Sequence, residues 1–222
     1  MKTRIVSFLS VLAILFILAA SSHAMNLQTI GTADYNGGSY NLIYDNDSPF
    51  GSIVWLDFTN SDNTWDNQVS WASGLNGAGL VNYHFNPGVN MNWSGSSWRL
   101  PSTVDDPASL GYDVTTSEMG HLYYTELGKP AWDFLGNTAP FTHLVPYTYW
   151  SGTEYAYNPI GAWFFNTGNG GQGAFFKDEY YCALAVRPGQ LESAAVPEPS
   201  TLLLVGGGLA GLALIKRKYR KQ

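Results

Sequence analysis

The clearest strand pattern of hydrophobic and polar residues covers residues 52–59, where Val54, Leu56 and Phe58 alternate with Ile53, Trp55 and Asp57. A period of two indicates a β-strand, because successive side chains of a strand point to opposite faces of the sheet. Residues 40–44 come just before this stretch and are expected to pair with it. The pattern therefore predicts two neighbouring strands in this part of the chain.

The next stretch, residues 64–75, repeats apolar residues at helical spacing. Trp65, Val69 and Ala72 fall on one face of a helix, and Gly77 follows as a residue that commonly ends helices. The candidate caps at its start are Ser61, Asn63 and Thr64. We expect an amphipathic helix that packs on the strands.

A second helix is predicted from Thr115 to Gly128. Thr115 and Glu118 have the spacing of a capping box, and Gly128 is suited to end the helix. The apolar face carries Met119, Leu122, Tyr123 and Leu127. Glu126 projects onto the same arc, where a carboxylate is costly unless it is paired. Either Arg99 or Arg187 is its candidate partner, or Glu126 lies at the edge of the face and reaches water.

The last third of the ectodomain has the pattern of a sheet. Residues 162–166 and 173–177 are predicted to form a hairpin around the Gly-rich turn 167–172. Residues 180–187 follow as a final strand. Pro188 begins a linker toward the C-terminus.

The N-terminus carries an apolar run, residues 5–20. Two basic residues precede it, and small residues stand at positions 22 and 24. This order is typical of a secretory signal peptide. We expect residues 1–24 to be removed by cleavage after Ala24.

The C-terminal residues 196–222 have three parts. Val196, Pro197, Glu198 and Pro199 form a short motif, an uncharged run rich in Leu, Gly and Ala follows over residues 201–215, and basic residues close the chain. In this order the three parts resemble a PEP-CTERM sorting signal. The resemblance implies export by a Gram-negative-type bacterium, processing near the motif by an exosortase, and a role in exopolysaccharide production and in biofilm or floc formation.

The length of the apolar run suits a transient anchor. As a helix its 15 residues reach about 22 Å, whereas a bilayer core is about 30 Å thick. The basic end is expected to stay cytoplasmic, and the prolines keep the motif extended and accessible to a protease. The sequence thus predicts an inner-membrane-anchored precursor that later reaches the cell surface or extracellular matrix; a plain single-pass anchor is the alternative.

Charge is distributed unevenly along the chain. Residues 25–195 hold four basic and 16 acidic residues, a net charge of −12, whereas the whole chain carries −6. Such an acidic surface repels phosphate backbones, so nucleic acid is not an expected partner. It could recruit divalent cations or simply aid solubility.

Several separated motifs in residues 52–189 belong to one pattern. They are Trp55-Leu56-Asp57-Phe58-Thr59-Asn60, Trp98-Arg99-Leu100-Pro101, Tyr149-Trp150-Ser151-Gly152-Thr153-Glu154, Ala162-Trp163 and Ala185-Val186-Arg187-Pro188-Gly189. Together they resemble the domain of unknown function at the C-terminus of collagen-like bacterial adhesins of the Lcl type. The resemblance implies an α+β fold, an irregular C-type-lectin-like or sulfatase-modifying-factor-like domain with two helices and small antiparallel sheets. It also implies association with surface polysaccharide.

This interpretation divides the chain into a signal peptide (1–24), an ectodomain (25–189), a linker (190–195) and the sorting signal (196–222). The ectodomain departs from better-known relatives of the implied fold. Formylglycine-generating enzymes use a cysteine pair, and calcium-dependent lectins use a Glu-Pro-Asn or Gln-Pro-Asp motif; neither occurs here.

Cysteine and histidine give little sign of catalysis. Cys182 is the only cysteine, so no intramolecular disulfide can form, and its place in an alternating strand predicts burial. His84, His121 and His143 are far apart in sequence, and His121 falls on the polar side of its predicted helix, where a solvated side chain is expected. A zinc site made by the three histidines is the alternative. No catalytic residue and no required cofactor is predicted.

Acidic pairs occur in predicted turns. They are Asp45 with Asp47, Asp105 with Asp106, and Asp178 with Glu179. Calcium takes several oxygen ligands from flexible loops, so it is a possible cofactor, although solvated turn acids explain the same pattern.

Two tryptophans lie in stretches that could present them to a sugar. Trp93 follows an Asn- and Gly-rich loop, and Trp150 lies in a Tyr-rich segment. Exposed aromatic rings can stack on sugars, although burial in the core is the more common position of a tryptophan.

We interpret the protein as a non-enzymatic surface or matrix protein that binds or organises extracellular polysaccharide. Its expected partners are the secretion machinery, an exosortase, the inner membrane transiently, and the polysaccharide. The alternatives are an enzyme acting on the polysaccharide or on exported proteins, and a purely structural acidic scaffold.

Overall fold

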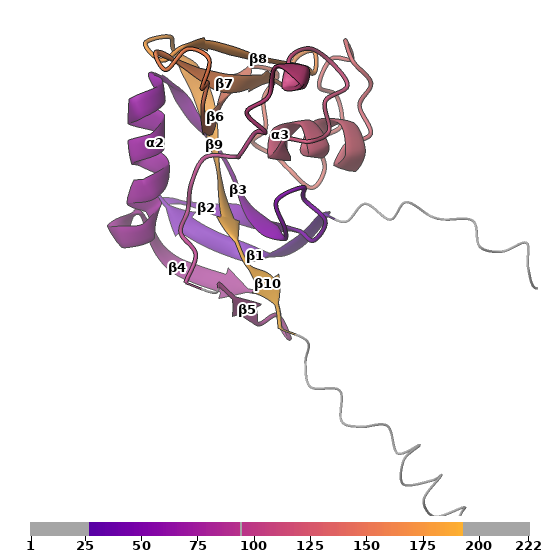
Figure 1. Cartoon of the computed structure of the whole chain (residues 1–222). Coiled ribbons are helices and arrows are strands. Elements are labelled where there is room, and N and C mark those ends of the chain that lie inside the picture. Colours follow the sequence, from indigo (N-terminus) through magenta and orange to yellow (C-terminus); the bar gives the residue numbers. More distant parts are fainter. Residues whose placement is uncertain (1–26, 94, 193–222) are drawn as a thin grey trace, which may run out of the picture.

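The computed structural model describes residues 27–93 and 95–192 (Figure 1). The strands are β1 (Leu27–Tyr35), β2 (Gly38–Asp45), β3 (Ile53–Asn63), β4 (Leu80–Phe85), β5 (Met91–Asn92), β6 (Thr148–Glu154), β7 (Gly161–Asn166), β8 (Gly171–Phe176), β9 (Tyr181–Pro188) and β10 (Gln190–Leu191). The helical segments are α2 (Trp65–Gly74), a π-helical turn (Leu75–Gly79), a 3₁₀ turn (Pro107–Ser109), and α3 (Glu118–Gly120), which continues as a second π-helical turn (His121–Glu126). The predicted signal peptide and sorting signal lie outside the described residues.

Eight strands form one sheet in the order β4-β1-β2-β3-β9-β6-β7-β8. Neighbouring strands are antiparallel except β6 and β9, which run parallel where Tyr149 lies opposite Cys182. A separate two-stranded sheet joins β5 to β10. The predicted α+β class, with two helices and mainly antiparallel strands, is confirmed. The expectation of small sheets is wrong, because β9 joins the N-terminal strands to the β6–β8 strands in one large sheet.

The central strands are buried on both faces of this sheet. In β3, Val54 and Leu56 belong to a core that includes residues of α2, whereas Ile53 and Trp55 belong to a core that includes residues of α3. We call these the α2 core and the α3 core. Helix α2 lies on one side of the sheet and α3 on the other (Figure 1). Burial on both faces explains why β3 begins with four consecutive apolar residues, 53–56, and why β9 is apolar over residues 181–186.

The strongest sequence patterns fold as predicted. β2 pairs with β3, with Leu42 opposite Leu56, and β7 pairs with β8 around the Gly-rich turn. Helix α2 buries Trp65 and Ala72, and Gly128 adopts a positive φ of 58° just after the second helix. A side chain with a Cβ adopts that conformation poorly, which is why glycine suits the position.

Other features of the described residues differ from the prediction. The capping residue of α3 is Ser117, whose hydroxyl accepts a hydrogen bond from the Gly120 amide at 2.9 Å. The Glu118 carboxylate instead accepts hydrogen bonds from the Arg99 guanidinium group. In the predicted linker, Gln190 and Leu191 form β10, whose partner is β5.

Candidate functional site

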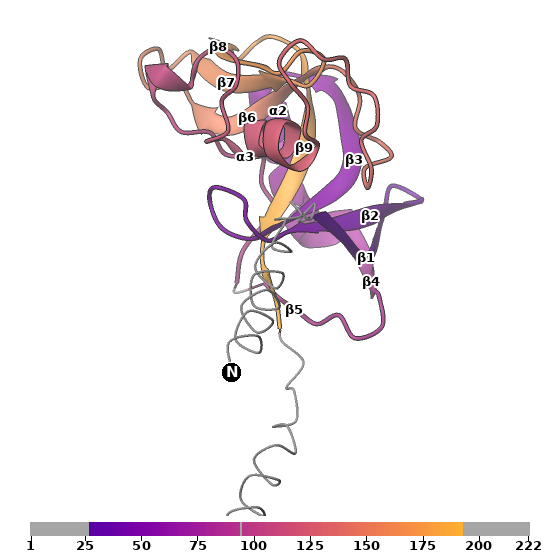
Figure 2. The same ribbon diagram turned by 90° about the vertical axis from the view of Figure 1, so that its right-hand side faces the viewer.

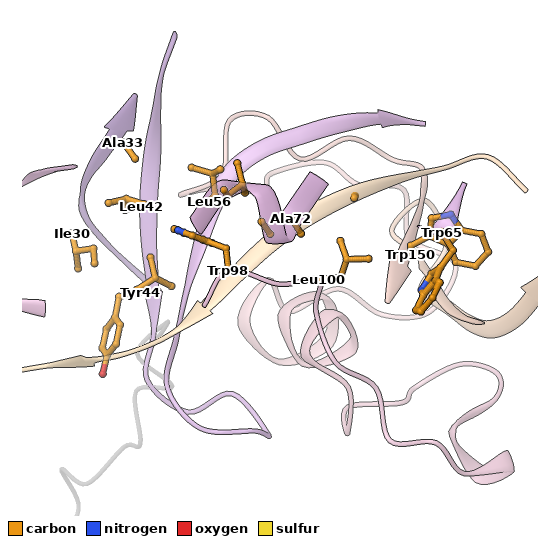
Figure 3. Close-up of a cluster of buried hydrophobic side chains, with 14 of the residues drawn as sticks. Ile30, Ala33, Leu42, Tyr44, Leu56, Trp65, Ala72, Trp98, Leu100 and Trp150 are labelled. Carbon is orange, nitrogen blue, oxygen red and sulfur yellow. The ribbon is translucent and has the colours of Figure 1, made fainter. Parts of the chain in front are cut away.

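The predicted ligand-binding tryptophans do not form an open site. Trp150 is fully buried (0% exposed) in the α2 core, and its indole N–H donates to the Asn63 carbonyl at 3.1 Å (Figure 3). The prediction that Trp150 contacts a ligand is therefore wrong, because β6 is an interior strand and this side of it faces the core. Trp93 is half-buried, and the Arg187 guanidinium lies over its ring, 4.4 Å from the centroid.

Exposed apolar side chains gather instead around β8, the edge strand of the large sheet. Phe175 and Phe176 end this strand with ring centroids 5.3 Å apart, and both are nearly half exposed. Tyr157 (68% exposed) and Ile160 lie in the turn between β6 and β7. We call Tyr157, Ile160, Phe175 and Phe176 the β8 apolar surface.

A hollow of about 610 Å³ opens beside Phe176. Its lining residues are Thr64, Asp66, Ile160, Phe176, Lys177 and Asp178. A smaller hollow of about 140 Å³ also includes Phe176, together with Phe175, Tyr155 and Asn158. Apolar rings can stack on a sugar, and carboxylate, hydroxyl and amide groups can form hydrogen bonds with its hydroxyls. The two hollows together contain both kinds of group.

One backbone hydrogen bond and two side-chain contacts position the walls of this hollow. The Trp65 amide at the start of α2 donates to the Lys177 carbonyl at 2.9 Å, which joins the helix to the segment after β8. The Lys177 ammonium lies over the Trp65 ring and contacts a Glu154 carboxylate oxygen at 3.0 Å. The walls are thus held by a hydrogen bond, an ion pair and a cation–π contact.

The hollow lies at one end of the molecule. In both views β7 and β8 are at the end opposite β5, the strand that pairs with β10 (Figures 1 and 2). The chain leaves the folded domain through β10 toward its C-terminus. The β8 apolar surface therefore lies far from the point where the sorting signal is attached.

A second group of side chains brings together residues that the sequence analysis treated separately. One oxygen each of Asp45, Asp47 and Glu126 and one nitrogen of His121 all lie within 4.8 Å of one another. His121 Nε2 is 3.3 Å from Asp47 Oδ1 and 3.5 Å from Glu126 Oε1. We call these four residues the His–carboxylate cluster.

Local backbone geometry explains this convergence. Asp45 ends β2 two residues after Ile43 of the α3 core, so its side chain is expected on the same face of the sheet. His121 and Glu126 begin and end the π-helical turn, in which the Leu127 amide donates to the Leu122 carbonyl five residues earlier. In an α-helix these two positions would point about 140° apart. The wider π turn brings them to one side.

Three of the four cluster residues are buried, and only Asp47 is exposed. Burial raises the pKa of Asp45, because an apolar environment disfavours its charged form, although the Trp55 indole N–H, 3.3 Å from Asp45 Oδ2, partly opposes this effect. The expectation of a solvated His121 is wrong, because the π turn directs it inward.

The predicted arginine partners of Glu126 are engaged elsewhere. Arg99 donates to both carboxylate oxygens of Glu118, at 2.7 and 2.8 Å, and Arg187 lies over Trp93. Glu126 is buried and faces His121 instead, so neither an Arg99 partner nor a water-exposed position was correct.

The structure also places the remaining candidate residues. Cys182 is buried, as predicted, and burial raises the pKa of its thiol to about 11. His84 contacts Asp34 and His143 contacts Asp57, so the three histidines do not meet at one site. Asp105 accepts from the Trp163 indole at 2.8 Å, whereas Asp178 lines the larger hollow.

Comparison with known proteins identifies the C-terminal tail. Residues 195–218 match the family model of the PEP-CTERM protein-sorting motif. No curated protein and no solved structure matches the chain. The match confirms the predicted sorting signal, which indicates an exported protein made as a membrane-anchored precursor and processed by an exosortase. The Lcl-type resemblance and the C-type-lectin-like fold stay predictions.

No helix among the described residues is long and apolar enough to cross a membrane. The predicted anchor, residues 201–215, lies outside the described part of the chain.

Proposed function

We propose that this exported protein binds extracellular polysaccharide, without catalysis, through the hollow beside Phe176. The observation that carries the proposal is the coincidence of one exposed aromatic ring, Phe176, and two carboxylates in one hollow of about 610 Å³. Sugar-binding sites need an apolar platform for the face of the ring and polar groups for its hydroxyls. Phe176 and Ile160 supply the apolar platform, and Asp66 and Asp178 supply the polar groups.

Two further observations support a polysaccharide ligand. The hollow is open and lies at the end of the domain away from the sorting signal, which suits a long chain that approaches from outside the cell (Figures 1 and 2). The resemblance of residues 52–189 to the Lcl-type adhesin domain implies the same class of ligand. Placement at the cell surface or in the matrix is part of this proposal.

The test measures binding of the full-length chain, purified in detergent, to the exopolysaccharide of the producing cell by isothermal titration calorimetry. Phe176→Ala is expected to raise Kd roughly 2- to 12-fold, because one aromatic contact contributes about 0.5–1.5 kcal/mol. Asp66→Asn tests the polar side of the same hollow and is expected to weaken binding as well.

Phe134→Ala is the control, because Phe134 is a phenylalanine that is even more exposed than Phe176 and lies outside both hollows. It is expected to leave Kd unchanged. Absence of saturable binding by the unmodified chain would overturn the proposal and favour an acidic scaffold. Equal losses in Phe134→Ala and Phe176→Ala would show that the hollow is not the binding site.

A further inference from the structure

The His–carboxylate cluster has an unbalanced charge for its degree of burial. It gathers three carboxylates and one imidazole, and Asp45, His121 and Glu126 are all buried. Buried carboxylates are costly unless a positive charge compensates them. Even a protonated His121 would supply one positive charge against three carboxylates.

No lysine or arginine of the described residues supplies the missing charge. Each of the four basic side chains in residues 27–93 and 95–192 has a contact of its own away from the cluster. Their contacts are Arg99 with Glu118, Lys129 with Asp133, Lys177 with Glu154, and Arg187 with the Trp93 ring. A metal ion held by the four side chains would supply positive charge at this position.

We propose that the cluster binds one divalent transition-metal ion, Zn²⁺ by its ligand set, through Asp45, Asp47, His121 and Glu126. Zn²⁺ accepts both imidazole nitrogen and carboxylate oxygen, at about 2.0–2.2 Å, and a tetrahedron of such bonds separates ligand atoms by about 3.3–3.6 Å. The nitrogen of His121 lies 3.3 Å from the Asp47 oxygen and 3.5 Å from the Glu126 oxygen. An imidazole ligand favours Zn²⁺ over Ca²⁺, which takes oxygen ligands.

The surroundings of the cluster resemble those of a built metal site. The Trp55 indole N–H is hydrogen-bonded to Asp45, and such outer contacts orient metal ligands. The buried Ser48 hydroxyl, next to Asp47 in the chain, has no hydrogen-bond partner among the described residues. The exposed Asp47 side chain provides the way in from solvent.

A bound ion would join two distant parts of the chain. Asp45 ends β2 and Asp47 lies in the turn after it, whereas His121 and Glu126 belong to the π turn about 75 residues later. The single cysteine means that no intramolecular disulfide can make this connection. The ion would therefore act as the crosslink between the sheet and the second helix.

The test uses the full-length chain in detergent, stripped with a chelator and dialysed. Zn²⁺, Mn²⁺ and Ca²⁺ are titrated separately by calorimetry, and thermal unfolding is followed by circular dichroism. We expect Zn²⁺ to bind with a stoichiometry of one and to raise Tm by about 5–10 °C at 100-fold excess over Kd.

Variants then locate the site. His121→Gln and Glu126→Gln are each expected to weaken Zn²⁺ binding by more than about 100-fold, and Trp55→Phe, which removes an outer contact, by about 10- to 100-fold. His84→Gln is the matched control, because His84 pairs with Asp34 at an exposed position. It is expected to keep the Kd of the unmodified chain.

Unfolding of each metal-free variant shows whether it still folds, so a lost site is distinguished from a lost fold. Absence of Zn²⁺ binding, or Zn²⁺ binding that His121→Gln and Glu126→Gln leave unchanged, would overturn the proposal. Binding of Ca²⁺ alone would overturn the assignment to a transition metal.

Discussion

Replacing Arg99 with methionine removes the counterion of a fully buried carboxylate. Glu118 is 0% exposed and accepts hydrogen bonds from Arg99 Nη1 at 2.7 Å, from Nη2 at 2.8 Å and from the Ser102 amide at 2.6 Å. Methionine has a similar reach but donates no hydrogen bond. The variant therefore keeps the Ser102 contact and loses the two charge-assisted ones.

The expected loss in the free energy of unfolding is about 3 kcal/mol. Removing one partner of a buried ion pair typically costs about 3–5 kcal/mol. The lower end applies because the Arg99 side chain is 33% exposed, so water screens part of the interaction. In a domain of this size, about 3 kcal/mol corresponds to a fall in Tm of roughly 6–12 °C.

Circular dichroism of the full-length chain in detergent measures this loss by thermal and urea unfolding. The double variant Arg99→Met, Glu118→Met is expected to recover most of it, because no buried charge is left unpaired. Lys129→Met is the control, because the Lys129–Asp133 pair is long at 3.8 Å and the Asp133 side chain is 45% exposed, so its loss should cost less than about 1 kcal/mol. The reasoning is refuted if Arg99→Met costs no more than the control, or if the double variant is no more stable than the single one.

Two further perturbations test other buried groups. Asp57→Ala should lower the free energy of unfolding by about 2–4 kcal/mol in the urea assay, because the Asp57 carboxylate accepts from the Thr142 amide and hydroxyl and the His143 amide; a loss below about 1 kcal/mol would contradict that. Cys182 should react with a thiol reagent at pH 8 at least about 100-fold more slowly in the folded chain than in urea, because burial raises its pKa to about 11 and the thiolate is the reactive form; equal rates would show that the thiol is accessible.

The sequence predicted the elements whose hydrophobic pattern follows from the burial of their own residues. β3 and α2 have clear periodicities, and the hairpin of β7 and β8 has a Gly-rich turn between apolar strands. β1 and β4 were missed, because polar residues such as Asp34 in β1 and Asn82 in β4 interrupt their apolar pattern. Such strands are specified mainly by their neighbours in the sheet.

The candidate sites depended on contacts that local patterns do not contain. Glu118 has the spacing of a capping box, but a guanidinium 19 residues earlier in the chain competes successfully for its carboxylate. His121 and Glu126 could not be placed together, because a helix with 3.6 residues per turn separates them. Only the π turn aligns them, and the sequence carries no clear signal for it.

The pairing of β10 with β5 sets the number of residues between the folded domain and the sorting motif. The described chain runs to Glu192, directly after β10, and Val196 follows four residues later. Four fully extended residues span at most about 14 Å. Any enzyme that engages Val196 therefore works within about 14 Å of Glu192, so the shape of the β5–β10 end becomes part of what the processing enzyme must accommodate.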